Sequence, residues 1–321
     1  MKAGVPEPGF PAFSAQTRLL GVAPHPDDET IATGLLVQRV RACGGAVRIL
    51  LLTDGDNNPW PQRWLERRLW IGPAARRRWG ERRHAEILRA LACLGLPPQA
   101  LHALGWPDLG VTEALLYRTA DAVACVADVV AAFRPDLVAM PSLDDRHPDH
   151  GSAHVLLRLA LAGHAMPPPR CLVYQVHGKS PRDAMPALSG SAGEVAKKRE
   201  ALEAHRSQMV LSGRRMRRLA ARPERLGWPA TAPWPAAALP WRPPAWLRPW
   251  LRLSVVGAQG AQTWAWRDAP LRRDQAGRFQ LCCAPGAAAA PRFARLALGF
   301  STFWIFDRWG WCELSPPSAG R

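Results

Sequence analysis

The 321-residue sequence lacks the features of a secreted or membrane-spanning protein. No run reaches the roughly 18 to 20 apolar residues that cross a bilayer, and the opening MKAGVPEPGFPAFSAQTR contains no apolar signal-peptide core. The seven cysteines are scattered, odd in number and free of any C-x-x-C pair, which argues against a disulfide framework. These absences predict a soluble protein of the reducing cytoplasm.

Lysine is scarce, although the chain is strongly basic. It occurs only at positions 2, 179, 197 and 198, so arginine carries nearly all of the excess behind the net charge of +16. Such a charge fits an acidic partner, for example a phosphorylated or lipid-linked sugar, a nucleic acid or an anionic membrane surface. It also fits a solvated basic surface, because net charge alone specifies no site. Both interpretations stay open.

Short apolar runs alternate with helical periodicity from Arg18 to about residue 210. We expect strands at residues 19–24, 47–55, 101–106, 136–142 and 171–178, and helices at Glu29–Cys43, Ala74–Leu94, Val111–Phe133, Gly151–Ala162 and Glu194–Met209. Apolar strands that alternate with helices are typical of a parallel sheet with both faces buried. The pattern therefore predicts an α/β, Rossmann-like fold: a mostly parallel sheet covered by helices on both faces.

The composition changes near residue 226. The stretch WPATAPWPAAALPWRPPAWLRPW is too rich in proline for a long helix. Short β-like runs follow it: LRLSVVG, TWAWRD, RFQLCC, FARLALGF and FWIFDRW. We therefore expect a loose arm at 1–17, a large α/β domain at 18–225, and a Pro/Trp-rich linker with a small β-rich extension at 226–321. Tryptophans of this extension suit a packed core, or an apolar surface for lipid or carbohydrate.

A first cluster of ionisable residues, PHPDDE at 24–29, directly follows the first expected strand. It places His25 beside three consecutive carboxylates, Asp27 to Glu29. Such a cluster is costly in a folded chain unless a cation or another partner neutralises it. A helix N-terminus would account for the acids, which the helix dipole favours, but not for His25.

A second cluster, DDRHPDH at 144–150, directly follows the fourth expected strand. In parallel sheets, ligands bind beyond the carboxyl ends of the strands, which is where both clusters fall. Together they supply His, Asp and His side chains with a spare carboxylate and a spare imidazole. A catalytic metal site needs this set: three protein ligands, an open position for water, and acid and base groups.

The two clusters resemble the motifs of the PIG-L (LmbE-like) N-acetylglucosaminyl deacetylase family. Four further segments resemble that family in the expected order: LLLTDGD at 50–56, an R-x-x-E helix from Arg83 and Glu86 to Leu94-Gly95, LGWPD at 104–108, and KREALEAHRSQ at 198–208. The resemblance covers about residues 18–210, and the tail beyond about 225 has no counterpart in it.

The resemblance implies a role for each matching residue. His25, Asp28 and His150 would bind zinc, although His and Asp ligands also accept other divalent metals. Asp27 would be the general base that activates water, and His147 would stabilise the oxyanion or protonate the leaving amine.

Other residues near the motifs have less defined roles. Arg83 and Asp108 resemble substrate-binding positions. Asp149 would orient a ligand histidine from outside the metal's own ligands. His205 fits either a packed helix residue or a part of the site.

The resemblance thus predicts a zinc-dependent hydrolase that removes the N-acetyl group from an N-acetylglucosamine-type conjugate. Its substrate could be phosphorylated or lipid-linked, with peripheral membrane contact; nucleic acid is not expected. Two alternatives remain: the same metal site could cleave another amide, such as a thiol conjugate or an antibiotic acyl group, or the chain could be a degenerate basic binding protein. The sequence specifies neither the oligomeric state nor the role of the C-terminal extension.

Overall fold

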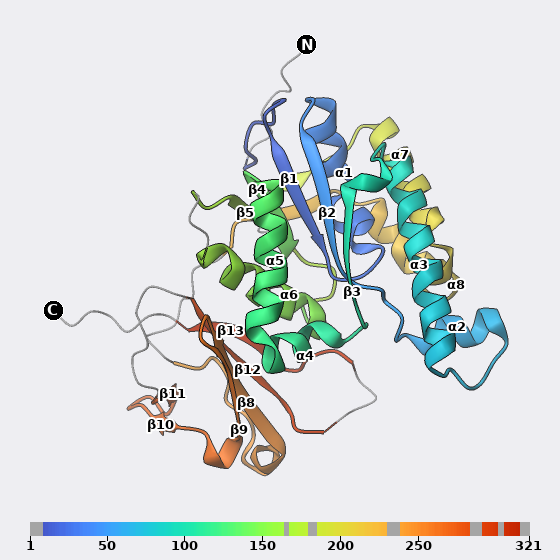
Figure 1. Ribbon diagram of the computed structural model, residues 1–321. Helices are drawn as coiled ribbons and strands as arrows, with labels where there is room; N and C mark the ends of the chain where they lie inside the picture. Colours follow the sequence, from blue (N-terminus) through green and yellow to red (C-terminus); the bar gives the residue numbers. More distant parts are fainter. Residues whose placement is uncertain are drawn as a thin grey trace. The chain divides into compact units, whose positions relative to one another are not determined.

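The computed structural model describes residues 9–163, 167–178, 185–229, 238–282, 291–300 and 305–314. The chain divides into two compact units (Figure 1). The first comprises Met1–Val111, Ala132–Ser142 and Pro169–Pro229, and the second Thr112–Ala131, Leu143–Pro168 and Ala230–Arg321. Residues 1–8 of the expected arm and 230–237 of the expected linker lie outside the described residues.

The first unit is built on a seven-stranded sheet in the order β3-β2-β1-β4-β5-β7-β6. Its strands are β1 (Arg18–Ala23), β2 (Ala46–Thr53), β3 (Leu101–Trp106), β4 (Leu137–Pro141), β5 (Arg170–Tyr174), β6 (Ala187–Leu188) and β7 (Glu224–Gly227). The five strands β1 to β5 run parallel. At one edge β7 pairs antiparallel with β5, and β6 pairs antiparallel with β7. The predicted mostly parallel sheet is confirmed.

Long hydrophobic runs form the central strands because both faces of the sheet are covered. All five residues of β4 are buried, and so are the last five residues of both β1 and β2. The strand order reverses between β1 and β4, which are neighbours in the sheet and far apart in sequence. Such a switch point is where ligands bind in open α/β sheets.

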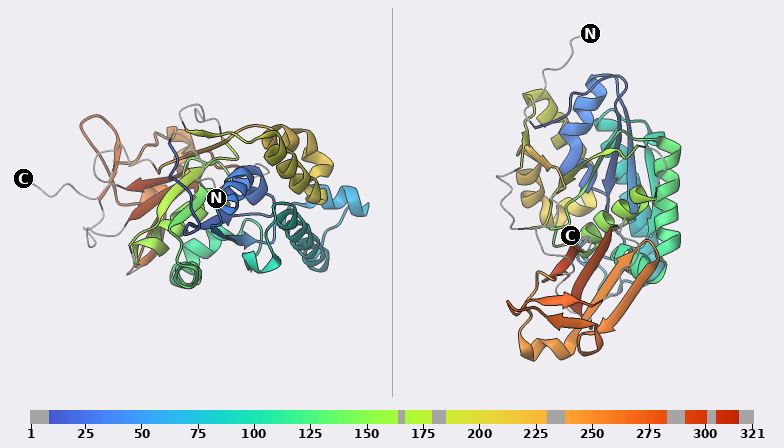
Figure 2. Two further views of the ribbon diagram at one scale, coloured as in Figure 1. Left: turned by 90° about the horizontal axis from the view of Figure 1, so that it is seen from above. Right: turned by 90° about the vertical axis from the view of Figure 1, so that its left-hand side faces the viewer.

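Five helices belong to the first unit: α1 (Asp28–Ala42), α2 (Pro59–Glu66), α3 (Pro73–Cys93), α7 (Ala192–Ala204) and α8 (Arg206–Ala220). Helices α3, α7 and α8 pack side by side (Figure 2). The expected single helix Glu194–Met209 is wrong, because the chain breaks at His205, which has the non-helical angles φ −79° and ψ 53°. The buried side chain of His205 explains this break and is described below.

The second unit contains α4 (Gly110–Tyr117), α5 (Thr119–Phe133), α6 (Pro148–Ala162) and the C-terminal strands. The expected single helix Val111–Phe133 is interrupted at Arg118. Beside the interruption, the hydroxyl of Thr119 donates to the carbonyl of Leu115, a bond that competes with helical geometry.

The C-terminal strands form an antiparallel four-stranded sheet, β13-β12-β8-β9, drawn in orange and red in Figure 2, and a β10–β11 ribbon. They are β8 (Leu251–Gly257), β9 (Gly260–Ala265), β10 (Leu271–Arg273), β11 (Phe279–Leu281), β12 (Arg292–Leu298) and β13 (Gly310–Leu314). The expected β-rich extension is confirmed. Its last strand was misplaced, because β13 begins after the FWIFDRW run, of which residues 303 and 304 lie outside the described residues.

Tryptophans of the extension serve both as core and as surface. Trp241 and Trp266 are buried in the core of the C-terminal sheet, whereas Trp246 and Trp250 are exposed. Within the second unit, Trp311 on β13 donates its indole N–H to Ser152 on α6, at 3.0 Å. None of the helices in the described ranges has the length and apolar character needed to cross a bilayer.

Candidate metal centre and catalytic site

The loop after β1 gathers two potential metal ligands at the start of α1. The backbone N–H of His25 donates to Oδ2 of Asp28 at 3.0 Å, and His25 Nδ1 lies 3.3 Å from the same oxygen. Both residues are buried, at 7% and 1% exposure. On the other side of the ring, His25 Nε2 lies 3.2 Å from Oδ1 of Asp108, which follows β3.

These separations fit a metal centre. Two ligands of a tetrahedral zinc ion, each bonded at about 2.0–2.2 Å, lie about 3.3–3.5 Å apart. The 3.3 Å between His25 Nδ1 and Asp28 Oδ2 matches that spacing. A buried imidazole beside buried carboxylates is also the donor chemistry that zinc accepts.

The peptide that joins Pro26 to Asp27 is held at both ends. Glu29 Oε2 accepts from the Asp27 N–H at 2.9 Å, and Arg83 Nη2 donates to the Pro26 carbonyl. Asp27 has φ 129°, a backbone conformation that a non-glycine residue adopts only under strain. The two bonds therefore hold the backbone at Asp27 in this strained conformation.

The Asp27 carboxyl also has an altered acidity. Burial raises its pKa to about 6, against the lowering effect of the Arg83 charge, while Asp28 raises it further. The Arg83 Nη2 atom lies 3.6 Å from Asp27 Oδ2. A carboxyl with a pKa near neutrality is suited to accept and return a proton.

Arg83 and Asp108, the two predicted substrate contacts, are both tied into the first unit. Arg83 is almost completely buried and donates through Nη1 to the Gly55 carbonyl after β2 at 2.7 Å. The Asp108 N–H donates to Asp56 Oδ1 at 2.9 Å. Arg83 thus connects the loops after β1 and β2, whatever it contributes to substrate binding.

His205, which lies far from the first motif in sequence, forms a buried pair with Glu29 of that motif. His205 Nε2 lies 2.9 Å from Glu29 Oε1, which also accepts from the Thr30 hydroxyl at 2.6 Å. Burial lowers the pKa of His205, but the charge and hydrogen bond of Glu29 outweigh it, so the pKa is raised. Next to His205, the N–H of Ser207 donates to Glu86 of α3. The R-x-x-E helix therefore braces the start of α8.

In the second unit, Asp145 organises the second motif. Its Oδ1 accepts from the His147 N–H at 3.0 Å, and its Oδ2 lies 3.2 Å from His150 Nδ1. With Nδ1 turned to a carboxylate, His150 presents Nε2 as the ligand atom, the usual arrangement for metal-binding histidines. Asp145 thus lies beside the His150 ring.

His147 caps the N-terminus of α6. Its Nδ1 accepts from the Asp149 N–H at 3.3 Å, so the neutral ring carries its proton on Nε2 and can donate it. The ring lies 5.2 Å from that of His150 and edge-on to Phe306 at 6.1 Å, centroid to centroid.

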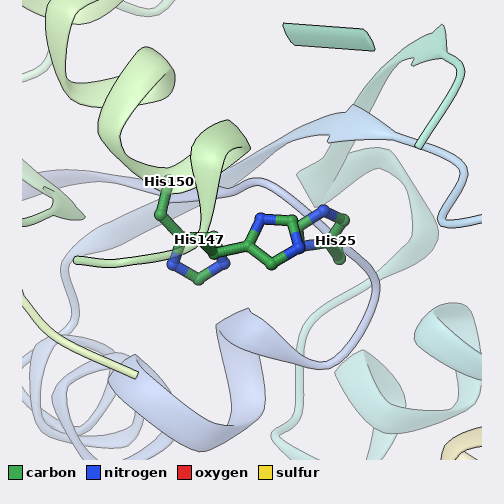
Figure 3. Close-up of side chains that lie close together, drawn as sticks. All are labelled: His25, His147 and His150. Atoms are coloured by element: carbon green, nitrogen blue, oxygen red, sulfur yellow. The ribbon is translucent and has the colours of Figure 1, made fainter. Parts of the chain in front are cut away.

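Figure 3 draws three histidines of the two motifs, His25, His147 and His150, and all three are buried. The predicted metal ligands His25 and Asp28 lie in the first unit, and the third, His150, lies in the second. From the sequence, Asp145 and Glu29 belong to the two clusters without an assigned role, and His205 stays open between a packed helix residue and a part of the site.

Comparison with known families supports the resemblance noted from the motifs. Residues 20–161 match the family model PIG-L, described as GlcNAc-PI de-N-acetylase. This range contains both motifs.

Two curated relatives are 1D-myo-inositol 2-acetamido-2-deoxy-alpha-D-glucopyranoside deacetylases. The one from Mycolicibacterium gilvum is 31% identical over 166 residues, covering 48% of this chain and 57% of that protein. The one from Mycolicibacterium vanbaalenii is 31% identical over 195 residues, covering 56% and 64%. The match thus spans a little over half of the length of these relatives.

Among solved structures, the chain is similar to N,N'-diacetylchitobiose deacetylase from Pyrococcus horikoshii. The TM-score is 0.51 at 18% sequence identity, over 65% of this chain and 82% of that chain. At this identity the similarity shows a shared fold, and it agrees with the sheet described above.

Proposed function

We propose that the protein is a metal-dependent de-N-acetylase of the PIG-L family, whose model residues 20–161 match. It would hydrolyse the amide of an N-acetylglucosamine-type conjugate and release acetate and a free amine. The observation that carries the proposal is the position of the two His/Asp motifs. They follow β1 and β4, adjacent parallel strands at the switch point of the sheet.

We propose His25, Asp28 and His150 as the ligands of a zinc ion. The buried His25–Asp28 pair has the spacing of two ligands of one ion, and Asp145 directs His150 Nε2 outward from the carboxylate. A bound zinc ion would polarise the amide carbonyl and make water more acidic. Other divalent metals also accept these ligands.

Asp27 and His147 are the proposed acid–base pair. Asp27, with its strained backbone held by Glu29 and Arg83, would accept a proton from the attacking water. His147 donates through Nε2, either to the developing oxyanion or to the nitrogen of the leaving amine. Because a neutral amine leaves more readily than an amide anion, a proton donor is required on the leaving side.

The substrate is proposed from the relatives, which act on an N-acetylated glucosamine linked to inositol. We infer an N-acetylated amino-sugar conjugate, in which Arg83 and Asp108 contact the sugar hydroxyls or a neighbouring group. The net charge of +16 would favour a conjugate that carries phosphate, including a lipid-linked one.

A cytoplasmic location is proposed on the cysteines. Six cysteines lie in the described part of the chain, and all six are free thiols. One of them, Cys312, is buried within the second unit, where burial raises its thiol pKa to about 12. Thiols that remain reduced are typical of a reducing compartment.

The test is acetate release from a panel of N-acetylglucosamine conjugates, including the inositol conjugate and a polyprenyl diphosphate-linked one. The chain is compared with His25→Ala and with Asp128→Asn, a control at an exposed acid of α5. We expect the wild type and the control to release acetate from at least one conjugate, and His25→Ala to release none. Equal release by all three proteins would refute the assigned site.

A further inference from the structure

Helix α2 and the loop after it expose large apolar side chains. Trp60 and Trp64 are 66% and 70% exposed, and Leu69 and Trp70 in the loop are 91% and 85% exposed. Leu65 is also exposed. These five residues are called here the α2 surface. A cluster of this kind is a feature of interaction sites, because single exposed apolar residues are common and contiguous groups are not.

The opposite face of α2 fixes the helix to the first unit. Pro61 and Gln62 are buried, and Gln62 Nε2 donates to the Ala75 carbonyl at 2.7 Å. Helix α2 packs against α8 and lies at the outer end of α3 and α8 (Figure 1). Trp60 and Trp64 are four residues apart and so point to one side of the helix. The apolar side chains are therefore presented by an anchored element.

The segment that carries the α2 surface is rich in arginine. Between Pro59 and Arg78 the sequence holds six arginines and one glutamate, Glu66, a local excess of 6 − 1 = +5. Glu66 is already paired with Arg78 at 3.2 Å. The Arg63 guanidinium lies over the Trp60 ring, 5.0 Å from its centroid. This local positive charge is complementary to an anionic partner.

The apolar side chains of the α2 surface indicate which partner fits it best. A second copy of the chain would bring the same positive charge and an overall +16 to the contact, so self-association is opposed. Single-stranded nucleic acid would use the tryptophans for base stacking but would leave Leu65 and Leu69 in water. Tryptophan at headgroup level, leucine below it and arginine against phosphate is the arrangement of an interfacial helix on an anionic bilayer.

We propose that the α2 surface docks the protein on an anionic phospholipid bilayer. Trp60, Trp64 and Trp70 lie at the depth of the headgroups, and Leu69 reaches the upper acyl region. Arg63, Arg67 and Arg68 contact lipid phosphates. This association goes beyond the proposed deacetylase activity and does not depend on it, because vesicle binding requires neither substrate nor metal.

The experiment is co-sedimentation of the full chain with vesicles of phosphatidylcholine alone or with about one third phosphatidylglycerol. Binding is expected only to the phosphatidylglycerol vesicles, and it should weaken with added salt. Trp64→Ser combined with Trp70→Ser should weaken it at least about tenfold. Arg67→Glu combined with Arg68→Glu should do the same while leaving the tryptophans in place.

Each variant has a matched control. Trp246→Ser with Trp250→Ser removes two exposed tryptophans of the second unit, and Arg267→Glu with Arg272→Glu makes the same change in net charge at exposed positions. Both controls should bind like the wild type, and circular dichroism should show all variants folded. Equal loss in variants and controls would mean a non-specific charge effect and overturn the proposal. So would wild-type vesicle binding by the tryptophan variant together with loss of binding to a single-stranded RNA.

Discussion

His205 and Glu29 form a buried pair, with His205 Nε2 2.9 Å from Glu29 Oε1. The other oxygen of Glu29 accepts from the Asp27 N–H, so a residue near the start of α8 is linked through one carboxylate to the proposed general base. Glu29 follows the predicted metal ligand Asp28 in sequence, but its carboxylate accepts the hydrogen bond from the Asp27 N–H. The pair gives the late His-x-x-Gln segment a reason to lie against the first motif.

His205→Gln is expected to lower kcat by about tenfold to a hundredfold, because a displaced Asp27 carboxylate meets the attacking water poorly. KM and zinc content should stay unchanged. The control is Lys198→Gln, which breaks a separate buried ion pair, between Lys198 of α7 and Glu224. That control should lower stability without a comparable loss of kcat. Equal kcat losses in the two variants would show that His205 acts through stability alone.

The same pair predicts a pH dependence of stability. Since the folded-state pKa of His205 is raised above 6.5, its stabilisation is complete below about pH 6.5 and is lost as pH rises through the folded value. Urea unfolding of the wild type at a series of pH values should show this decline. His205→Gln should remove that part of the slope. An unchanged slope in the variant would contradict the raised pKa.

Asp27→Asn should abolish catalysis while retaining the metal. The amide keeps the shape of the side chain but cannot accept a proton, so kcat should fall by about 10²–10⁴-fold. Zinc content, measured on the same sample, should match the wild type because Asp27 is not one of the proposed ligands. Loss of zinc along with activity would instead make Asp27 a ligand.

Asp145→Asn should weaken metal binding. Its carboxylate faces His150 Nδ1, and loss of such an orienting group typically costs about 10–100-fold in metal affinity. The adjacent, exposed Asp144→Asn is a matched control that should bind zinc like the wild type. Zinc affinity measured by competition with a chromophoric chelator separates the two. Equal zinc affinities of the two variants would show that Asp145 does not orient His150 and only accepts the hydrogen bond from the His147 N–H.

The sheet could be predicted from the sequence because its strands are short apolar runs separated by helical periods, a pattern that burial on both faces dictates. The position of the two motifs after β1 and β4 could be predicted in the same way, because the end of each apolar run marks the end of a strand. The break at His205 could not be predicted, because it depends on Glu29, distant in sequence. The role of Asp145 was hidden for a similar reason: three acids precede or separate the motif histidines, and only the fold shows which one faces His150.

Helix α2 was missed for another reason. Its eight residues include two prolines and two tryptophans, and too few turns for a clear periodicity. Asn58 caps the helix and Pro59 occupies its first position, as is common at helix N-termini. The burial of Pro61 and Gln62 then stabilises the short helix.

Zinc content and acetate release, measured together on one purified sample before chelation, after chelation and after zinc is restored, test the metal-dependent deacetylase most directly. We predict about one zinc ion per chain, with acetate release that disappears on chelation and returns with the metal. A folded chain that binds no zinc after metal is restored, and that releases no acetate from any conjugate of the panel, would contradict it.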